Sequence, residues 1–227
     1  MKEIEVFELI KNTILSIQKN KIKPICVAIN GIEGTGKTTM TEKLTKFLNH
    51  NNIHTIHVSI DGFHNKKESR YKQGRDSAKG YYEDSYNENE FIEKVLKSSQ
   101  SNSPNITNAI HDLESNEDLD LESIELNYNT VLITDGAYLF KKIYRNYWDL
   151  KIYLKTSFEI ALERGIDRDK DLFGGVEKTK EKYEKRYHQS SKIYNDENCP
   201  EDFANIIIDN SDFDNLKILK NLITNKN

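Results

Sequence analysis

The feature that most constrains this chain is a glycine-rich octapeptide near its amino terminus. Residues 31–38 read Gly-Ile-Glu-Gly-Thr-Gly-Lys-Thr and are followed by Thr39. In the spacing G-x-x-x-x-G-K-[ST], backbone N–H groups surround phosphates, the lysine reaches the β- and γ-phosphates, and the following hydroxyl helps to hold Mg²⁺. An apolar run at 25–29 precedes the motif and helical spacing over 37–48 follows it, which is the strand–loop–helix context the motif requires. We therefore predict a site for ATP and Mg²⁺ formed by Gly31, Gly34, Thr35, Gly36, Lys37, Thr38 and Thr39.

The remaining pattern predicts one α/β domain over residues 1–227. Further strands are predicted at 54–61, 131–136, 150–154 and 204–209. Helices are predicted at 3–19 within an amino-terminal segment 1–22, and at 87–98, 157–169, 177–194 and 211–223. Strands and helices that alternate in this way predict a five-stranded parallel sheet with helices on both faces.

Three segments do not fit the alternating pattern. Residues 62–86 are polar and rich in Arg and Tyr, and a loop of this length in a compact domain is usually functional, so we interpret it as an excursion over the site. A charged segment with Gly174-Gly175 at its centre is predicted to be a lid over 170–185. Short apolar stretches over 106–126, after a linker at 98–105, indicate a small β excursion.

Composition narrows the classes of partner. The net charge of −4 and the pI near 5.9 argue against a nucleic-acid surface. Cys26 and Cys199 have no metal-ligand spacing, which makes zinc improbable and predicts reduced thiols. No apolar run approaches the eighteen or so residues of a membrane span, so we expect no membrane partner and a cytoplasmic location. The sequence does not decide the oligomeric state, and a homo-oligomer is possible.

Two acidic residues follow predicted strands at the edge of the sheet that carries the phosphate loop. Asp61 ends the strand at 54–61 and Asp135 ends the strand at 131–136. One carboxylate near Mg²⁺ and a γ-phosphate can deprotonate an acceptor hydroxyl, and the other can hold the metal. Each acid also precedes a glycine and could simply begin a turn. Because two acids occur in this position, we predict that both serve the reaction, one as the base and the other, with Thr38, in the metal site.

Arginines are the third group of candidates. Arg70 and Arg75 alternate with tyrosines in the excursion, a pattern suited to holding a polar substrate by charge and stacking. Arg164 and Arg168 lie four residues apart on one helix face before the lid, where they could reach the transferring phosphate; a solvated charged face is the alternative. For His64 and His188 we expect loop or surface roles, because phosphoryl transfer to a hydroxyl needs no histidine.

Taken together, the motifs resemble the uridine-kinase-like branch of the phosphoribulokinase/uridine kinase family. The resemblance rests on residues 31–39, 61–64, 70–77, 80–86, 133–136, 186–187 with 194, and 207–210. It implies a nucleoside-monophosphate-kinase-like P-loop fold with a lid, Mg-ATP as donor, and a small hydroxyl-bearing acceptor. By the same resemblance, Asp61 matches the acid that activates the acceptor hydroxyl, Asp135 matches the acid after the Walker B strand, and Arg164 and Arg168 match arginines that lead into the lid. We therefore predict Asp61 as the base and Asp135, with Thr38, as the metal site, with Lys37, Arg164 and Arg168 as further catalytic residues. For the acceptor we predict contacts with Arg70, Tyr71, Arg75, Tyr81, Tyr82, Asp84, Arg186 and Tyr187.

The identity of the acceptor stays open at this stage. A nucleoside such as uridine or cytidine is the first prediction, but the Asp-Gly-Phe-His at 61–64 departs from the Asp-Ser-Phe-Tyr of uridine kinases and also resembles bacterial pantothenate kinase. Pantothenate or another small alcohol is therefore an alternative. An acceptor-independent ATPase or switch is an alternative of another class, although the Asn-Lys-x-Asp guanine signature is missing, and a catalytically silent nucleotide-binding module is a third.

Overall fold

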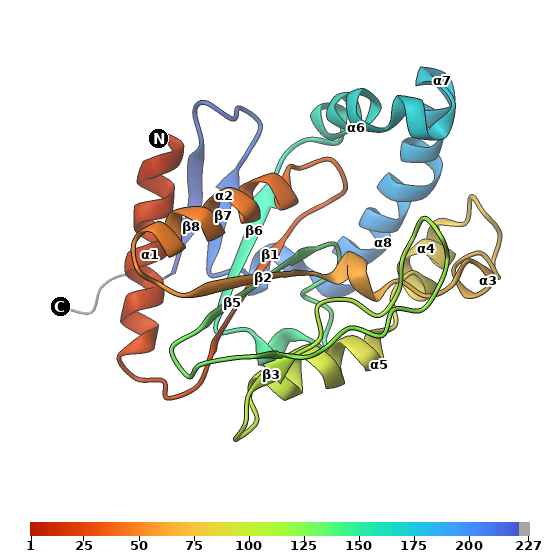
Figure 1. Cartoon of the computed structure of the whole chain (residues 1–227). Helices are drawn as coiled ribbons and strands as arrows, with labels where there is room; N and C mark the ends of the chain where they lie inside the picture. The colour runs from red at the N-terminus through yellow and green to blue at the C-terminus, as the bar shows by residue number, and fades with distance from the viewer. Residues whose placement is uncertain (223–227) are drawn as a thin grey trace.

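A six-stranded sheet forms the centre of the computed structural model, which describes residues 1–222 (Figure 1). The strand order is β2-β5-β1-β6-β7-β8, with parallel pairing throughout except that β8 runs antiparallel to β7. The strands span β1 Ile25–Asn30, β2 Thr55–Ser59, β5 Val131–Gly136, β6 Leu150–Lys155, β7 Ile206–Asp209 and β8 Lys217–Asn221. The predicted five parallel strands are thus confirmed, and a sixth is added.

Helices cover both faces of this sheet (Figure 1). Alternate residues of β1 point to opposite faces: Val27 packs into the core beneath α1 and α2, whereas Ala28 packs into the core beneath α5 and α8. The adjacent strands β1 and β5 are buried along their whole length, as expected for a parallel sheet covered on two sides. The helices span α1 Glu3–Gln18, α2 Lys37–His50, α3 Lys67–Arg70, α4 Ala78–Asp84, α5 Glu88–Phe91 with the π-helical continuation η2 Ile92–Lys97, α6 Phe158–Phe173, α7 Val176–Lys182 with the π-helical η4 Tyr183–Tyr187, α8 His188–Asn198 and α9 Pro200–Phe203.

The carboxyl-terminal helix predicted at 211–223 is wrong within the described residues. The chain after β7 instead turns and returns as β8, which pairs with β7 in antiparallel register. Alternating burial along Lys217–Asn221, with every second residue exposed, is the pattern of a half-covered edge strand. Residue 223, the last of the predicted helix, lies outside the described residues.

The segments flanking the site are more regular than predicted. The excursion at 62–86 holds α3 and α4, and the excursion at 106–126 is closed by a short antiparallel pair, β3 Asn105–Ile106 and β4 Ile124–Glu125. Helix α6 runs to Phe173, four residues beyond its predicted end, so the predicted lid consists of the end of α6, the turn at Gly174-Gly175 and α7.

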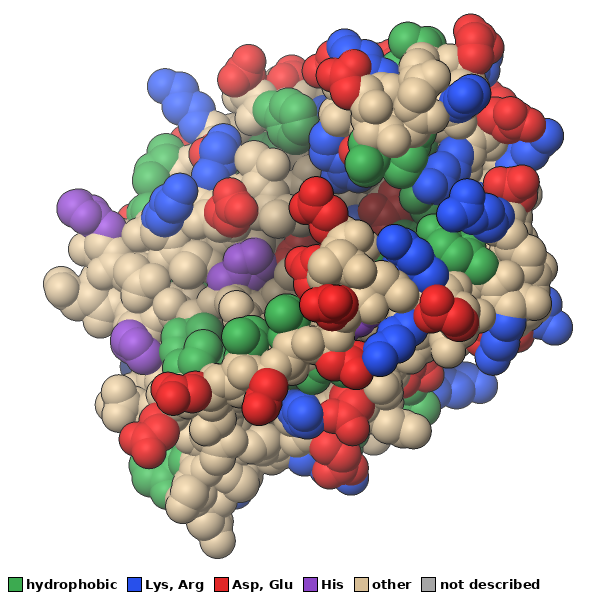
Figure 2. All heavy atoms as spheres, turned by 45° about the vertical axis from the view of Figure 1, so that its right-hand side comes forward, with side chains coloured by type: hydrophobic (Ala, Val, Ile, Leu, Met, Phe, Trp, Pro, Cys, Tyr) green, Lys and Arg blue, Asp and Glu red, His purple; other side chains and the backbone are tan. Residues whose placement is uncertain are grey.

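The carboxyl ends of the parallel strands open onto a hollow between α6–α7 and α3–α4. Figure 2 shows this side of the molecule, where acidic and basic side chains gather around the hollow. In open parallel sheets, ligands bind at this edge. Among residues 1–222, no helix is both long and apolar enough to span a membrane.

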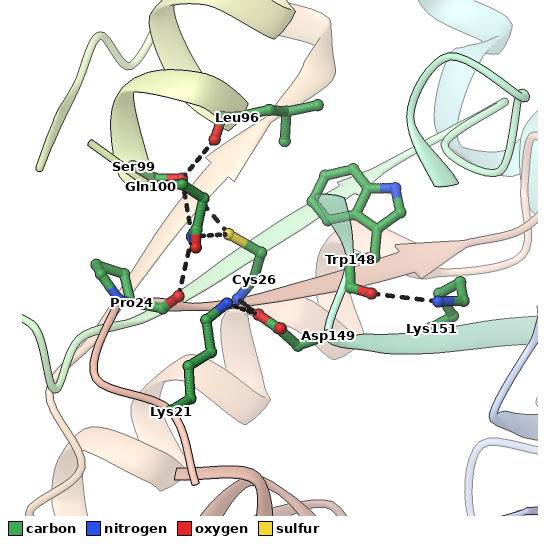
Figure 3. A network of polar contacts seen from close by, with 9 residues as sticks. All are labelled: Lys21, Pro24, Cys26, Leu96, Ser99, Gln100, Trp148, Asp149 and Lys151. Atoms are coloured by element: carbon green, nitrogen blue, oxygen red, sulfur yellow. Dashed lines mark hydrogen bonds and ion pairs between the residues drawn. The ribbon is translucent and has the colours of Figure 1, made fainter. Parts of the chain in front are cut away.

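A polar network closes the opposite end of the sheet (Figure 3). The carboxylate of Asp149 accepts a hydrogen bond from the backbone N–H of Cys26 at 2.8 Å and forms an ion pair with Lys21. The Cys26 thiol contacts Ser99 and Gln100, at the end of the helix that begins with α5. This network ties the start of β1 to the end of the helix formed by α5 and η2.

Candidate active site

The phosphate loop adopts a backbone that requires glycine. Gly34 and Gly36 have φ angles of +85° and +86°, in the left-handed region that other residues enter at a cost. A Cβ at Gly34 would lie 2.2 Å from the carbonyl oxygen of Ala161 on α6, so there is no room for a side chain. Gly36 is also the N-cap of α2. Thr35 braces the loop from within, because its buried hydroxyl donates to the carbonyl of Ile32 at 2.9 Å.

Lys37, Thr38 and Asp135 meet where the loop enters α2. The Nζ of Lys37 is buried beside the loop and donates to the carbonyl of Ile32 at 2.9 Å. Thr38 Oγ1 donates to Asp135 Oδ2 at 2.7 Å, and His57 Nε2 lies 2.7 Å from Asp135 Oδ1. Burial favours the neutral acid, but the hydrogen bonds from His57 and Thr38 outweigh it and hold the pKa of Asp135 below its usual value. Asp135 is therefore an ionised carboxylate at physiological pH.

The donor set at this point suits Mg²⁺. The Thr38 hydroxyl and Asp135 carboxylate are adjacent oxygen ligands, the type that Mg²⁺ takes in combination with water and substrate phosphates. Within residues 1–222 there is no group of three or more His, Cys, Asp or Glu side chains that could hold a metal. A cation here would share its coordination with the nucleotide, as expected for a phosphate-loop site.

Asp61 lies just beyond β2, in the 3-10 turn η1 Ile60–Phe63, rather than at the end of the strand itself. Its carboxylate is 56% exposed and faces the hollow, and Oδ1 accepts a hydrogen bond from the Tyr86 hydroxyl at 2.9 Å. His64 Nδ1 contacts the Asp61 carbonyl at 2.7 Å, and its ring packs on Tyr86 at 4.6 Å. The carboxylate is thus anchored on one oxygen and open to a ligand on the other.

The surroundings of Asp61 disfavour its charged form. The protein walls around the carboxylate, together with the charges of Glu33 and Asp135, raise the pKa of Asp61 above its ordinary value. His64 and the Tyr86 hydroxyl act in the opposite direction. A raised carboxyl pKa in a cleft is typical of a group that exchanges protons in catalysis.

Two cavities meet at Asp61. The donor cavity, about 240 Å³, is lined by Glu33, Gly34, Gly36, Lys37, Thr38, Thr39, Asp61, Asp135, Gly136, Ala137, Arg168 and Asp169. The acceptor cavity, about 370 Å³, is lined by Glu33, Asp61, His64, Lys67, Arg70, Tyr71, Tyr81, Leu113, Arg168, Asp169, Leu172, Phe173, Lys182, Arg186 and Tyr187. The two cavities share Glu33, Asp61, Arg168 and Asp169. This junction is where a group could pass from one bound molecule to another.

Most predicted site residues line one of these cavities, and some do not. Arg75 is exposed and stacks on Tyr71 without lining either cavity. Tyr82 is buried and donates its hydroxyl to Glu197 at 2.8 Å, while Asp84 forms an ion pair with Lys72. Gly31 and Thr35 shape the phosphate loop from outside the donor cavity. The residues that both the sequence and the geometry bring together in the acceptor cavity are Arg70, Tyr71, Tyr81, Arg186 and Tyr187.

The two arginines of α6 have different surroundings. Arg168 lies at the junction of the cavities, where it forms a bidentate pair with Asp169 at 2.7 and 3.0 Å. Arg164 points away: it donates to the carbonyls of Asn210 and Ser211 at 2.8 and 2.9 Å and stacks 3.7 Å above the ring of Phe213. In this arrangement Arg164 fixes the loop after β7 and does not reach the cavity junction.

The structure also brings to the site residues that the sequence did not predict there, among them Glu33, His57, His64 and Lys182. Glu33 faces both cavities and accepts a hydrogen bond from Tyr81 at 3.0 Å. His64 was expected in a loop or surface role, but it is 7% exposed and forms part of the cavity wall. No sequence motif predicts a role at the site for His57 or Lys182. The signal for His57 is its position in β2, two residues before the strand ends. In the parallel pairing of β2 with β5, His57 lies on the same face of the sheet as Asp135.

With this geometry established, comparisons with known proteins identify the family. The model of the phosphoribulokinase/uridine kinase family matches residues 26–196. The chain belongs to this family.

Individual relatives are more distant. A uridine kinase from Borrelia garinii subsp. bavariensis is 29% identical over 144 residues, which cover 63% of this chain and 66% of that protein, just under two thirds of its length. A possible uridine kinase from Bacillus stearothermophilus superimposes with a TM-score of 0.69 at 18% identity, covering 88% of this chain and 96% of the other. A D-glycerate 3-kinase from Cryptococcus neoformans reaches 0.58 at 10% identity, covering 94% and 99%. At these identities the structures show the shared fold.

Proposed function

We propose that this protein is an ATP-dependent kinase that transfers the γ-phosphate of Mg-ATP to a hydroxyl group of a small molecule. The observation that carries the proposal is the position of Asp61, at the junction of a phosphate-loop cavity and a second, separately lined cavity. A nucleotide hydrolase needs no second cavity for a small molecule, whereas a two-substrate kinase does. Family membership supports the same reading.

Asp61 is the base in this proposal. Its Oδ1 is held by Tyr86, and its exposed second oxygen can accept the proton of an acceptor hydroxyl. As the hydroxyl oxygen forms its bond to the γ-phosphorus, the bond from that phosphorus to the bridging oxygen breaks and ADP leaves. The proton taken up by Asp61 passes to water when the product departs. Because charge spreads over the phosphoryl oxygens during transfer, cations at the junction stabilise the transition state.

Lys37, Thr38 and Asp135 hold the donor. The adjacent Thr38 hydroxyl and Asp135 carboxylate would hold Mg²⁺, which neutralises phosphate charge when bound. Lys37 reaches the phosphates by exchanging its contact with the Ile32 carbonyl for phosphate oxygens. Arg168, on α6 beside α7, is placed to contact the transferring group once the lid segment closes and excludes water.

The acceptor is the finer part of the proposal. The names of the relatives make a nucleoside such as uridine the first candidate. The tyrosines of the acceptor cavity, Tyr71, Tyr81 and Tyr187, could stack on a base. A small alcohol such as pantothenate is the second candidate, and the cations Arg70, Lys182 and Arg186 in the acceptor cavity favour a charged acceptor of that kind.

The decisive experiment compares ADP formation with and without acceptors. Purified protein with Mg-ATP should form ADP slowly alone and at least tenfold faster when a pool of nucleosides, pantothenate and sugars is added, with a phosphorylated product detected by mass spectrometry. Fast hydrolysis that no acceptor accelerates would instead support the ATPase alternative.

A further inference from the structure

The acceptor cavity contains a buried guanidinium without a partner. Arg70, at the end of α3, is 8% exposed, and its side chain forms no hydrogen bond or ion pair with any residue that the structure describes. Its guanidinium carbon lies 5.4 Å from the centre of the Tyr71 ring. Burying a charge without a counter-charge is unfavourable, so such a group is usually completed by a ligand.

Arg186 and Lys182 add two further cations to the same wall. Arg186 is 3% exposed and lies between the rings of Tyr71 and Tyr81, at 4.7 and 4.9 Å. It donates to the backbone carbonyl of Arg75, while its Nε has no partner. Lys182 lies 3.7 Å above the ring of Phe173. Neither side chain pairs with a carboxylate among residues 1–222.

The charges of the cavity are segregated. Its acidic residues, Glu33 and Asp61, lie in the part shared with the donor cavity. Arg70, Lys182 and Arg186, together with Lys67, line only the acceptor cavity. The remaining pair at the junction, Arg168 with Asp169, is neutral overall.

The pKa shifts of Tyr71 and Lys182 agree with a concentration of positive charge in this cavity. Partial burial favours the neutral phenol of Tyr71, but the charges of Arg186, Arg70 and Lys182 outweigh it and lower the pKa of Tyr71. Burial, together with the neighbouring charges of Arg186 and Arg75, lowers the pKa of Lys182. An anion placed among these cations would relieve their mutual repulsion.

We propose that the acceptor carries an anionic group, a carboxylate or a phosphate, which Arg70, Arg186 and Lys182 bind while the acceptor's hydroxyl faces Asp61. This inference rests on the proposed phosphoryl transfer and narrows its substrate class to hydroxy acids or sugar phosphates. Guanidinium groups match the planar oxygens of carboxylates and phosphates in two-point contacts, and the unpartnered Nε atoms of Arg70 and Arg186 are free to make them. A neutral nucleoside would leave all three cations unpaired.

The competing explanation is that these cations serve the phosphates of ATP. A sulfate-binding measurement separates the two. With Mg²⁺ and a non-hydrolysable ATP analogue at saturation, the donor cavity is filled, and sulfate should still bind in the acceptor cavity. Arg70→Met should weaken this sulfate binding at least tenfold and leave the affinity for the ATP analogue within twofold. Lys79→Met, on the exposed side of neighbouring α4, should change neither.

The same variant tests whether Arg70 is merely structural. Because Arg70 has no partner in the free protein, Arg70→Met should keep or raise the melting temperature without ligands. Absence of sulfate binding to the analogue-saturated wild type, or loss of affinity for the ATP analogue in Arg70→Met, would overturn the inference. So would a melting temperature lowered by Arg70→Met together with unchanged sulfate binding.

Matched acceptors complete the test. Pantothenate against panthenol, glycerate against glycerol and ribose 5-phosphate against ribose differ in the anionic group, and uridine represents the neutral nucleoside. Phosphorylation should favour the charged member of a pair by at least tenfold, with the preference lost in Arg70→Met. Efficient phosphorylation of uridine by wild type and Arg70→Met alike would refute the anionic acceptor but uphold the kinase. Failure of all acceptors with intact sulfate binding would instead count against the proposed transfer reaction.

Discussion

The hydrogen bond between Tyr86 and Asp61 should set the acid limb of the reaction's pH profile. Asp61 acts as base only when ionised, so kcat/KM should rise with pH through the pKa of Asp61 and then level off. The Tyr86 hydroxyl stabilises the ionised form from 2.9 Å, and Tyr86→Phe removes that stabilisation while keeping the ring that packs on His64. The pKa of Asp61 should therefore rise, and the acid limb should move to higher pH.

The size of this shift follows from the exposure of the carboxylate. A hydrogen bond to a charged group contributes about 1.5–3 kcal/mol. Asp61 is 56% exposed, so water replaces part of the lost bond, and about half of that value is expected. At about 1.4 kcal/mol for each pH unit, the acid limb should move upward by roughly 0.5–1 pH unit, with little change in the plateau rate.

The assay is a coupled measurement of ADP formation from about pH 4.5 to pH 9. It uses an acceptor that the wild-type enzyme has been shown to phosphorylate. Tyr82→Phe is the matched control, because Tyr82 is a neighbouring buried tyrosine whose hydroxyl bonds to Glu197 away from both cavities. An acid limb that stays in place in Tyr86→Phe, or that moves equally in Tyr82→Phe, would refute the assignment of Asp61 as the titrating base.

Two further predictions concern the framework of the site. Gly34→Ala should lower the free energy of unfolding by at least about 2 kcal/mol, or the melting temperature by about 4–8 °C, because a Cβ there would lie 2.2 Å from the Ala161 carbonyl oxygen. Gly74 also has a positive φ but has nothing within 4 Å of an added Cβ, so Gly74→Ala should lower the free energy of unfolding less. Equal losses in the two variants would contradict the steric argument. A thiol reagent at pH 8 should modify Cys199, which is exposed, but not Cys26, because burial raises the pKa of Cys26 to about 11 (Figure 3). Fast labelling of both thiols before unfolding would show that the network around Cys26 opens readily.

Much of the donor half of the site could be predicted from sequence because its signals are local. A glycine loop, its lysine and its threonine lie within eight consecutive residues, and the strand before and helix after them carry their own periodicity. Asp135 follows the same logic, since a buried strand that ends in an acid places that acid at the sheet edge. These features need no knowledge of distant packing.

The acceptor half depends on contacts between distant segments, which periodicity does not report. Arg70 and Arg186 are 116 positions apart in sequence, yet both guanidinium groups lie close to the ring of Tyr71. Arg164, four residues before Arg168, shared a predicted face with it, yet its side chain follows the β7–β8 loop instead. The helix predicted at 211–223 hides that loop, because the sequence alone does not distinguish the short edge strand Lys217–Asn221 from a helical tail.

The central claim, that Asp61 is the base of a two-substrate kinase, is tested most directly by Asp61→Asn. Asparagine keeps the size of the side chain and can still accept the Tyr86 hydrogen bond, but it cannot take up a proton. The account predicts that kcat/KM for acceptor phosphorylation falls by about 10²–10⁴, while the Kd of the non-hydrolysable ATP analogue stays within about twofold. Acceptor phosphorylation at the wild-type rate in Asp61→Asn would contradict it.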